Sequence, residues 1–334
     1  MKRILITGAC GFIGHHFVEH TFKNTDWEIV ALDRLDGAAT YGRFTDMDTW
    51  DIYKSRIKFV WHDLKAPINE FIKREIGHID YIVHLAASSH VDRSITFPME
   101  FVMDNVVGTC NLLEYARNLD YKLEKIVYFS TDEVFGPAPE GTDYKEWDRY
   151  RSSNPYSASK AGGEELAIAY ENTYKLPIII THCMNVFGER QHPEKFLPLV
   201  VKKILYDEEI LIHSDETKTK SGSRFYIHAR DVADAVIHIL KSETQNGDKF
   251  NIRGYREVEN LELAQLVSKY IGKPMRYQMI NFHGSRPGHD LRYALDGEKL
   301  KEMGWQPAQP FEVRLEKTVR WMIAHPKWLL IDHQ

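Results

Sequence analysis

A glycine-spaced segment near the N-terminus constrains the fold more than any other feature. An apolar run over residues 4–7 leads directly into Gly8-Ala-Cys-Gly11-Phe-Ile-Gly14, and an amphipathic segment follows to about Lys23. A strand, a glycine turn and a helix in this order are typical of a dinucleotide-binding βαβ unit. The three glycines allow a tight turn, close approach of a pyrophosphate, and close packing of the helix on the strand. The segment therefore predicts a diphosphate at the N-terminus of this helix.

Apolar runs and amphipathic segments alternate through the first half of the chain. Helices are predicted over about 99–118 and 155–174, and further strands over 28–33, 57–61, 80–85, 125–131 and 177–181. The strands read as apolar on both sides, which is expected for a parallel sheet covered by helices on both faces. This alternation predicts the α/β class, with a doubly wound parallel Rossmann sheet.

The pattern becomes irregular after residue 186. Prolines and a polar stretch over 214–223 interrupt it, while helices are still expected at 231–241, at 261–271 and in a last segment ending near Ala324. We predict an NAD-binding domain over 1–186, to which a segment near 225–255 returns. Residues 187–334 are expected to form mainly a smaller mixed α/β lobe that binds the substrate.

Composition excludes several other classes of protein. The net charge of -5 gives no general electrostatic reason to bind nucleic acid or an anionic membrane surface. Three scattered cysteines do not make a disulfide framework, and the sixteen histidines show no metal-binding spacing, so no metal is predicted. The first strand begins near Lys2, which leaves no room for a signal peptide, and no apolar run reaches transmembrane length. The expected location is the cytoplasm.

The cofactor is predicted from the residue that ends the second strand. Asp33 can accept hydrogen bonds from ribose hydroxyls and would repel a 2′-phosphate, which favours NAD over NADP. The neighbouring Arg34 keeps NADP open as an alternative. The segment after the third strand, His62-Asp63-Leu64, is expected to line the adenine. A polar strand end with no ligand is the alternative interpretation of this segment. The residues expected to contact the cofactor are Gly8, Gly11, Phe12, Ile13, Gly14, Asp33, Asp63, Leu64, Ala86, Tyr156 and Lys160.

Tyr156 and Lys160 are four residues apart on a predicted helix and therefore share one face. The Lys160 ammonium and a positive nicotinamide ring would both lower the pKa of the phenol, so that Tyr156 could take an alcohol proton during hydride transfer. An exposed Tyr and Lys on a surface helix is the alternative. Thr131, at the end of a predicted strand, favours the catalytic interpretation because ligands collect at that edge of a doubly wound sheet.

Two carboxylates, Asp132 and Glu133, follow the strand that ends at Thr131. A simple alcohol dehydrogenase needs no second acid and base, so the pair indicates that a further bond is broken. Neighbours on a strand point to opposite faces, so the backbone must leave strand geometry near Asp132 if both are to reach one substrate. Two close carboxyls do not ionise equally, which lets one act as an acid and the other as a base. A structural acidic loop is the alternative.

These motifs resemble those of the extended short-chain dehydrogenase/reductase family. Four segments are similar to the nucleotide-sugar 4,6-dehydratases, particularly the dTDP-glucose type, and the resemblance runs from Ile4 to Trp321. The segments are residues 86–95, Ser130-Thr-Asp-Glu-Val-Phe-Gly136, residues 193–198 and Arg286-Pro-Gly-His-Asp-Leu-Arg-Tyr293. The resemblance implies oxidation of a sugar at C4, elimination of water across C5 and C6, and return of the hydride to C6 with NAD regenerated.

The resemblance also implies roles for individual residues. Glu133 would be the C5 base, Asp132 the C6 acid and Tyr156 the C4 base, with Lys160 its electrostatic support and Thr131 a hydrogen-bond partner of the C4 oxygen. A homodimer formed by the helices at 99–118 and 155–174 is implied as well. For the charged residues among the implied substrate contacts, the alternative is a position on the solvent-exposed surface of the second lobe. The implied contacts of the nucleotide sugar are Ser88, His90, Asn185, Glu194, Lys195, Leu197, Arg224, Arg286 and His289.

The chain departs from the dTDP-glucose pattern near the expected substrate site. Asn185-Val186 replaces two consecutive asparagines, Phe135 replaces a residue that is usually Tyr, and Arg224-Phe225 replaces Arg-Asp. dTDP-glucose is the first hypothesis, and UDP-glucose and GDP- or UDP-linked N-acetylglucosamine compete with it. A nucleotide-sugar epimerase or decarboxylase would share the fold and the Tyr/Lys pair. A non-catalytic NAD-binding regulator should have lost Tyr156 or Lys160, and both are present.

Overall fold

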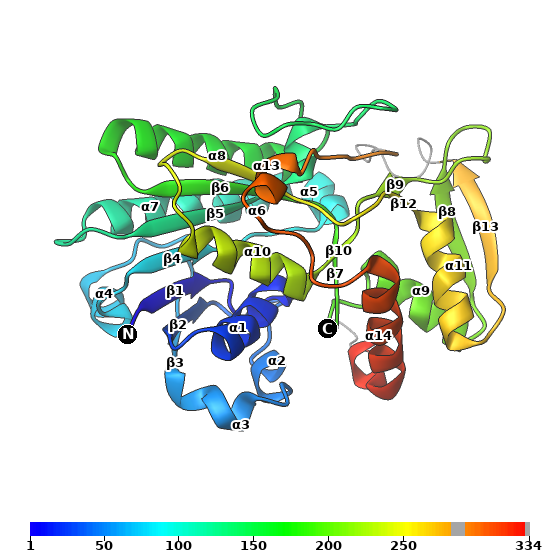
Figure 1. Cartoon of the computed structure of the whole chain (residues 1–334), viewed down its shortest axis with the longest axis horizontal. Helices are drawn as coiled ribbons and strands as arrows, with labels where there is room; N and C mark the ends of the chain where they lie inside the picture. The colour runs from blue at the N-terminus through cyan, green and yellow to red at the C-terminus, as the bar shows by residue number, and fades with distance from the viewer. Residues whose placement is uncertain (282–290, 331–334) are drawn as a thin grey trace.

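A seven-stranded parallel sheet forms the centre of the computed structural model, which describes residues 1–281 and 291–330 (Figure 1). Its strand order is β11-β6-β5-β4-β1-β2-β3, and every neighbouring pair is parallel. The predicted α/β class and doubly wound sheet are confirmed. The strands are β1 (Arg3–Thr7), β2 (Glu28–Asp33), β3 (Ile57–Trp61), β4 (Tyr81–His84), β5 (Lys125–Thr131), β6 (Ile178–Cys183) and β11 (Lys249–Ile252).

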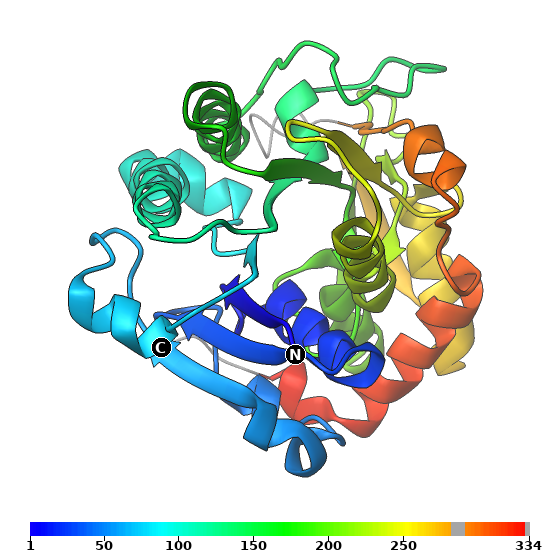
Figure 2. The same cartoon turned by 60° about the vertical axis from the view of Figure 1, so that its left-hand side comes forward.

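Helices cover both faces of the sheet (Figure 2). On β1, Ile4 and Ile6 belong to one buried apolar cluster and Leu5 to another, because successive strand side chains point to opposite faces. The first cluster is completed by α1 (Phe12–Asn24) and α10 (Ala229–Lys241), which pack against each other. The second is completed by α7 (Gly108–Arg117) and α8 (Pro155–Tyr174). Each strand thus contributes to two apolar layers.

The predicted elements of the first half lie within two residues of the observed ones, with one difference in kind. The helix expected over about 99–118 consists of α6 (Pro98–Val102), a π-helical turn (Met103–Val107) and α7. Elements too short to show in the sequence pattern join the others. They are α2 (Gly42–Thr45), α3 (Trp50–Tyr53), α4 (Glu70–Ile76), α5 (Val91–Thr96) and the 3-10 turns Lys54–Arg56 and Asp132–Phe135.

The later part of the chain has an apolar core of its own. Val200 of α9 (Phe196–Leu205), Leu263 of α11 (Asn260–Ile271) and Leu315 of α14 (Phe311–Ala324) are fully buried in it. The division of the chain at residue 186 stays a prediction. The remaining elements are β7 (Val186–Phe187) paired with β10 (Ile227–His228), β9 (Ser223–Arg224) with β12 (Val258–Glu259), β8 (Glu209–Ser214) with β13 (Arg276–Asn281), α13 (Glu298–Glu302) and the turn Pro326–Trp328.

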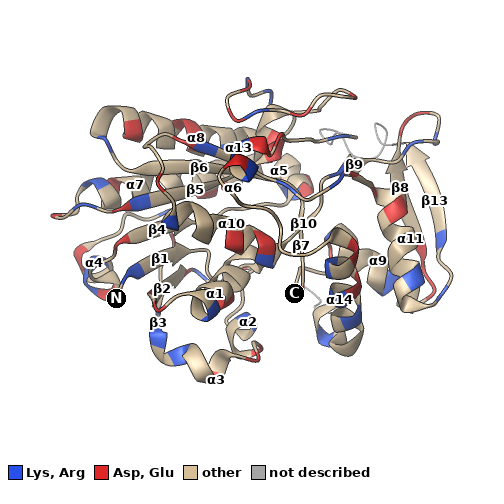
Figure 3. Ribbon diagram, viewed as in Figure 1, with Lys and Arg blue, Asp and Glu red and all other residues tan. Residues whose placement is uncertain are grey.

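Charged residues of both signs are spread along the helices on both sides of the sheet (Figure 3). Within residues 1–281 and 291–330, no helix is long and apolar enough to cross a membrane. The same part of the chain contains no group of three or more His, Cys, Asp or Glu side chains arranged to hold a metal ion.

Candidate active site

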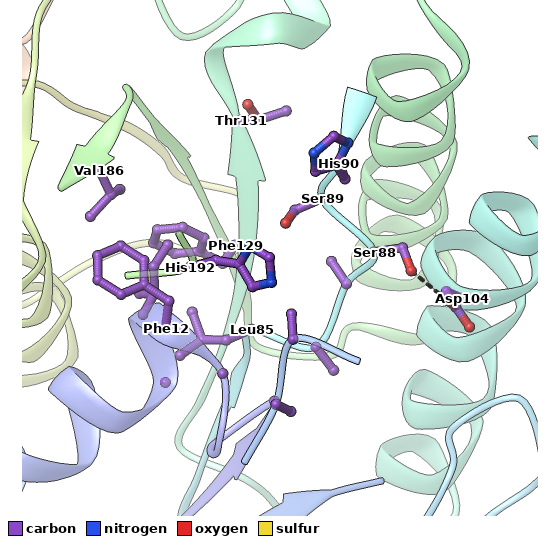
Figure 4. Close-up of a pocket in the computed structure, with 18 of the residues that line it drawn as sticks. Phe12, Leu85, Ser88, Ser89, His90, Asp104, Phe129, Thr131, Val186 and His192 are labelled. Carbon is purple, nitrogen blue, oxygen red and sulfur yellow. Dashed lines mark hydrogen bonds between the residues drawn. The ribbon is translucent and has the colours of Figure 1, made fainter. Parts of the chain in front are cut away.

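A cavity of about 940 Å³ opens at the carboxyl edge of the sheet, where β1 and β4 lie side by side. The chain leaves β1 toward β2 on one side and later returns to β4 on the other, and ligands of doubly wound folds bind at such a switch point. Phe12 of α1, Leu85 after β4 and Thr131 at the end of β5 all lie around the cavity (Figure 4). All the residues predicted to contact the cofactor line it, as do Thr131, Asp132 and Glu133.

The glycine turn is packed too closely against neighbouring backbone to accept side chains at Gly8 and Gly14. Gly8 has φ +67°, and a Cβ there would lie 2.7 Å from the Cα of Ala86. At Gly14 a Cβ would lie 2.1 Å from the Gly8 carbonyl oxygen, so the helix can pack this closely only with glycine. Gly11, the N-cap of α1, provides no side-chain cap, and the first N–H groups of the helix therefore face an anion site. The turn fits the diphosphate of a dinucleotide.

Asp33 is held in place for a ribose. Its carboxylate accepts hydrogen bonds from the backbone N–H groups of Cys10 and Leu35, both at 2.9 Å. Burial raises the pKa of Asp33, and these two hydrogen bonds oppose the rise. Arg34, which left NADP open as an alternative, is paired with carboxylates of the chain itself, including Asp104 at 2.6 Å. The geometry therefore fits NAD better than NADP.

The backbone leaves strand geometry where the carboxylate pair requires it. Strand β5 ends at Thr131, and Asp132 begins a 3-10 turn that also contains Glu133. The predicted change of backbone geometry is confirmed. The Thr131 hydroxyl donates to Asp132 Oδ1 at 3.1 Å, while Glu133 Oε2 accepts from Asn154 Nδ2 at 3.3 Å. The two carboxylates are thus adjacent and differently held.

Asp132 has the properties of a carboxylic acid that keeps its proton. It is 4% exposed, and its Oδ2 is buried without a hydrogen-bond partner among the described residues. Burial raises its pKa to about 7, with Glu133 adding to the rise and Arg224 and Thr131 opposing it. A buried carboxyl beside a second carboxylate is the arrangement that separates an acid from a base.

Lys160 and Tyr156 project from the first two turns of α8. A capping box formed by Asn154 and Ser157 fixes the start of this helix. The Lys160 ammonium donates to the Phe129 carbonyl oxygen at 2.7 Å, and burial lowers its pKa to about 8.

The predicted lowering of the Tyr156 pKa is not found in the chain itself. Burial raises the pKa of this phenol, and the neighbouring Glu133 carboxylate raises it further. A hydrogen bond with Thr131 acts in the opposite direction. The prediction was wrong for the protein groups because it counted the Lys160 charge and left out the burial and the carboxylates. A cationic ligand beside Tyr156 would act against both.

Six of the residues predicted to contact the substrate line the same cavity: Ser88, His90, Asn185, Glu194, Lys195 and Leu197. His90 Nε2 lies 3.4 Å from the Glu194 carboxylate, and Lys195 donates to the Ser89 carbonyl oxygen at 3.3 Å. These contacts join the segment after β4 to the segment before α9. The substrate roles of all six stay predictions.

Arg224 is placed differently. It is not among the residues that line the described part of the cavity. Its guanidinium lies 4.5 Å from the Tyr293 ring centroid and donates to the Leu291 carbonyl oxygen at 2.6 Å. Arg286 and His289 lie outside the described residues.

The sequence and fold match known enzymes over nearly the whole chain. The family model described as GDP-mannose 4,6 dehydratase matches residues 5–318. The chain is 35% identical over 351 aligned positions to the dTDP-glucose 4,6-dehydratase of Salmonella typhimurium, which covers 98% of this chain and 94% of that protein. The chain belongs to the nucleotide-sugar 4,6-dehydratase family.

Further relatives agree with this membership. The dTDP-glucose 4,6-dehydratase of Neisseria gonorrhoeae is 36% identical over 343 positions, with 96% of each chain covered. The solved structure of DesIV, the dTDP-glucose 4,6-dehydratase of Streptomyces venezuelae with NAD bound, has a TM-score of 0.87 at 33% identity and covers 98% of this chain and 99% of that chain.

Other chemistries share the fold of the 4,6-dehydratases. The UDP-glucuronic acid 4-epimerase of Bacillus cereus has a TM-score of 0.85 at 25% identity, with 97% of this chain and 99% of that chain covered. The backbone therefore does not decide between water loss and epimerisation. The choice between the two reactions must depend on the side chains in the cavity, and Asp132 and Glu133 are the candidates for it.

Two residues of the π-helical turn, Asp104 and Asn105, belong to this 4,6-dehydratase site and were not predicted from the sequence. Asn105 Oδ1 accepts from the Ser88 N–H at 2.9 Å, and its Nδ2 donates to Ser159 Oγ at 2.8 Å. Its neighbour Asp104 lines the cavity. Polar residues are common on an amphipathic helix, so the sequence did not indicate that Asn105 supports the site or that Asp104 lines it.

Proposed function

We propose that this chain is an NAD-dependent nucleotide-hexose 4,6-dehydratase that acts on dTDP-glucose. The observation that carries the proposal is the buried Asp132, with its raised pKa, beside Glu133 and Tyr156 in the cavity that the glycine turn and Asp33 also line. The names of the relatives in Salmonella typhimurium and Neisseria gonorrhoeae support the substrate.

The first step is oxidation at C4. The chemistry that NAD supplies, when bound, is removal of the C4 hydride, its later return to C6, and a positive ring that favours tyrosinate. Tyr156 takes the proton of the C4 hydroxyl as the C4–H bond breaks, and Thr131 hydrogen-bonds the same oxygen. Lys160, held by the Phe129 carbonyl, provides a positive charge one helical turn from Tyr156. The resulting ketone acidifies the C5 hydrogen.

The second step is loss of water, for which the carboxylates are needed. Glu133 removes the C5 proton, and Asp132 gives its proton to the C6 oxygen as the C6–O bond breaks. Glu133 then returns a proton to C5 when the hydride reaches C6. Tyr156 ends the cycle protonated and Asp132 ionised, so one proton must pass between them. The Thr131 hydroxyl contacts both side chains and offers a path.

Incubation with a panel of nucleotide hexoses tests the proposed reaction. We expect the NAD-loaded protein to convert dTDP-glucose into a product that has lost one water, observed by mass spectrometry. UDP-glucose and GDP- and UDP-N-acetylglucosamine serve as the competing substrates. A product of unchanged mass would indicate an epimerase, and loss of carbon dioxide from a nucleotide uronic acid would indicate a decarboxylase. No water loss from any hexose would contradict the dehydratase proposal.

The proposal includes a homodimer. Exposed apolar side chains gather on α5, α6 and the start of the π-helical turn, next to α8. A patch of this kind beside the two helices implied by the resemblance fits a second copy of the chain. Its members are Ile95, Phe97, Met99, Val102 and Met103.

We expect a dimer of the 39.0 kDa chain in sedimentation or light scattering, and a monomer for Met99→Glu, whose parent side chain is 66% exposed. A charge in the centre of an apolar interface would have to be desolvated without a partner. Ile52→Glu is the matched control, because Ile52 is 69% exposed on α3. A dimer that survives Met99→Glu would place the interface elsewhere, and a monomeric parent chain would exclude the homodimer.

We propose that the product serves deoxysugar biosynthesis. A 4-keto-6-deoxyhexose still attached to its nucleotide is a precursor for further sugar modification and transfer. That the protein takes part in polysaccharide biosynthesis and that it is cytoplasmic stay predictions.

A further inference from the structure

The guanidinium of Arg34 is surrounded by carboxylates. Nη1 and Nη2 form a bidentate pair with Asp104, at 2.6 and 2.8 Å, and Nε lies 2.6 Å from Asp36. Asp63 lies 3.5 Å from Nη1. The arginine and all three carboxylates line the same cavity as Asp33, the residue placed for the ribose.

Asp104 differs from the other partners of Arg34 in burial and in support. Its side chain is 8% exposed, whereas that of Asp36 is 58% exposed. Asp104 Oδ2 also accepts a 2.5 Å hydrogen bond from Ser88 Oγ (Figure 4). Burial alone would raise the pKa of Asp104, but the hydrogen bonds from Arg34 and Ser88 outweigh it and leave the pKa below its usual value. Asp104 is therefore a fixed negative charge.

We propose that Asp104 is a positioning residue that makes the site selective for NAD by keeping Arg34 away from a 2′-phosphate. An arginine beside the carboxylate that ends the second strand is the side chain able to accommodate that phosphate in NADP. Here Asp104 and Asp36 occupy both edges of its planar fork. To receive a phosphate, Arg34 would have to leave the largely buried Asp104 with only the Ser88 hydroxyl and, 3.9 Å away, the Lys65 ammonium as partners, which is unfavourable.

The position of Asp104 in the fold agrees with this role. It lies on the π-helical turn Met103–Val107, and π turns inside helices are frequent at functional sites. The turn places Asp104 against Arg34 while the next residue, Asn105, binds the Ser88 segment. The inference rests on the proposed function only in treating the cavity as a dinucleotide site.

Asp104→Asn tests the proposal, because it removes the charge and keeps the size of the side chain. We expect the ratio of the NADP dissociation constant to the NAD dissociation constant to fall about thirtyfold, with NAD still preferred because Asp33 remains. Cofactor-free protein would be titrated with each dinucleotide by calorimetry. Mass spectrometry of the dinucleotide that copurifies with the protein gives a second readout.

Two variants separate the role of Asp104 from a general charge effect. Asp36→Asn removes a charge from the same arginine but leaves the bidentate pair, so the ratio should change by no more than about threefold. The double variant Asp104→Asn with Arg34→Ala should lose the gain in NADP binding, because the released guanidinium provides it. Asp104→Ser makes the same test if the asparagine variant does not fold.

An unchanged ratio in the Asp104 variants would overturn the inference, as would an equal shift in Asp36→Asn or a gain that persists without Arg34. These results are distinct from a failure of the proposed function. If the parent chain binds neither dinucleotide, the cavity is not a dinucleotide site. If it binds NAD and the Asp104 variants keep the parent ratio, only the role of Asp104 is wrong.

Discussion

Tyr156→Phe is expected to lower the rate of dehydration by about 10³-fold or more and to prevent reduction of the cofactor by the sugar nucleotide. The substitution removes only the phenol oxygen, which is the proposed base for the C4 hydroxyl. The ring is buried and packs edge-on against Phe101, so its contacts are kept. A single-turnover measurement of reduced nicotinamide absorbance would show no formation of the reduced cofactor.

Tyr170→Phe provides a matched control for this prediction. Tyr170 lies on the same helix, α8, and its hydroxyl donates to Glu114 at 2.5 Å. Neither residue lines the described part of the cavity. This variant should dehydrate at the parent rate. Thermal unfolding would establish that both variants are folded. If Tyr156→Phe reduced the cofactor within about tenfold of the parent rate, another group would have to be the C4 base.

Features that are local in the sequence could be predicted well. The glycine turn, the Tyr156/Lys160 spacing and the Asp132–Glu133 pair each depend on residues within a few positions of one another. Steric limits on the turn and the periodicity of helix and strand then place them. The requirement that the backbone leave strand geometry at Asp132 followed from the same local rule.

Features that depend on distant residues could not be predicted. Asp104 lies 70 residues from Arg34, and only the fold brings the two together. The direction of the Tyr156 pKa shift depends on burial and on Glu133, which spacing along a helix does not reveal. The contacts of the Arg224 guanidinium with the Tyr293 ring and the Leu291 carbonyl oxygen also depend on the fold, and its substrate role stays a prediction.

The double variant Asp132→Asn with Glu133→Gln is expected to separate oxidation from dehydration. Oxidation at C4 uses Tyr156, Lys160 and Thr131, all of which remain, so reduced cofactor should still form with the correct substrate. Loss of water should slow by about 10³-fold or more, because neither amide can take the C5 proton or protonate the C6 oxygen. Reduced nicotinamide should therefore persist in a single turnover while mass spectrometry shows substrate that has kept its water.

The pH dependence of dehydration gives the same pair a second test. Asp132 must be protonated to act as the acid, and its pKa is raised to about 7, so dehydration by the parent enzyme should fall as the pH rises through 7. Asp132→Asn alone should be slow and should lose the decline through pH 7, since its amide does not titrate. A decline above about pH 8, where Lys160 loses its charge, should remain. Glu140→Gln, which changes an exposed carboxylate, should keep both the rate and the decline. Normal water loss by the double variant would mean that the carboxylates serve the structure of the turn, and that the acid and base of the elimination lie elsewhere in the cavity.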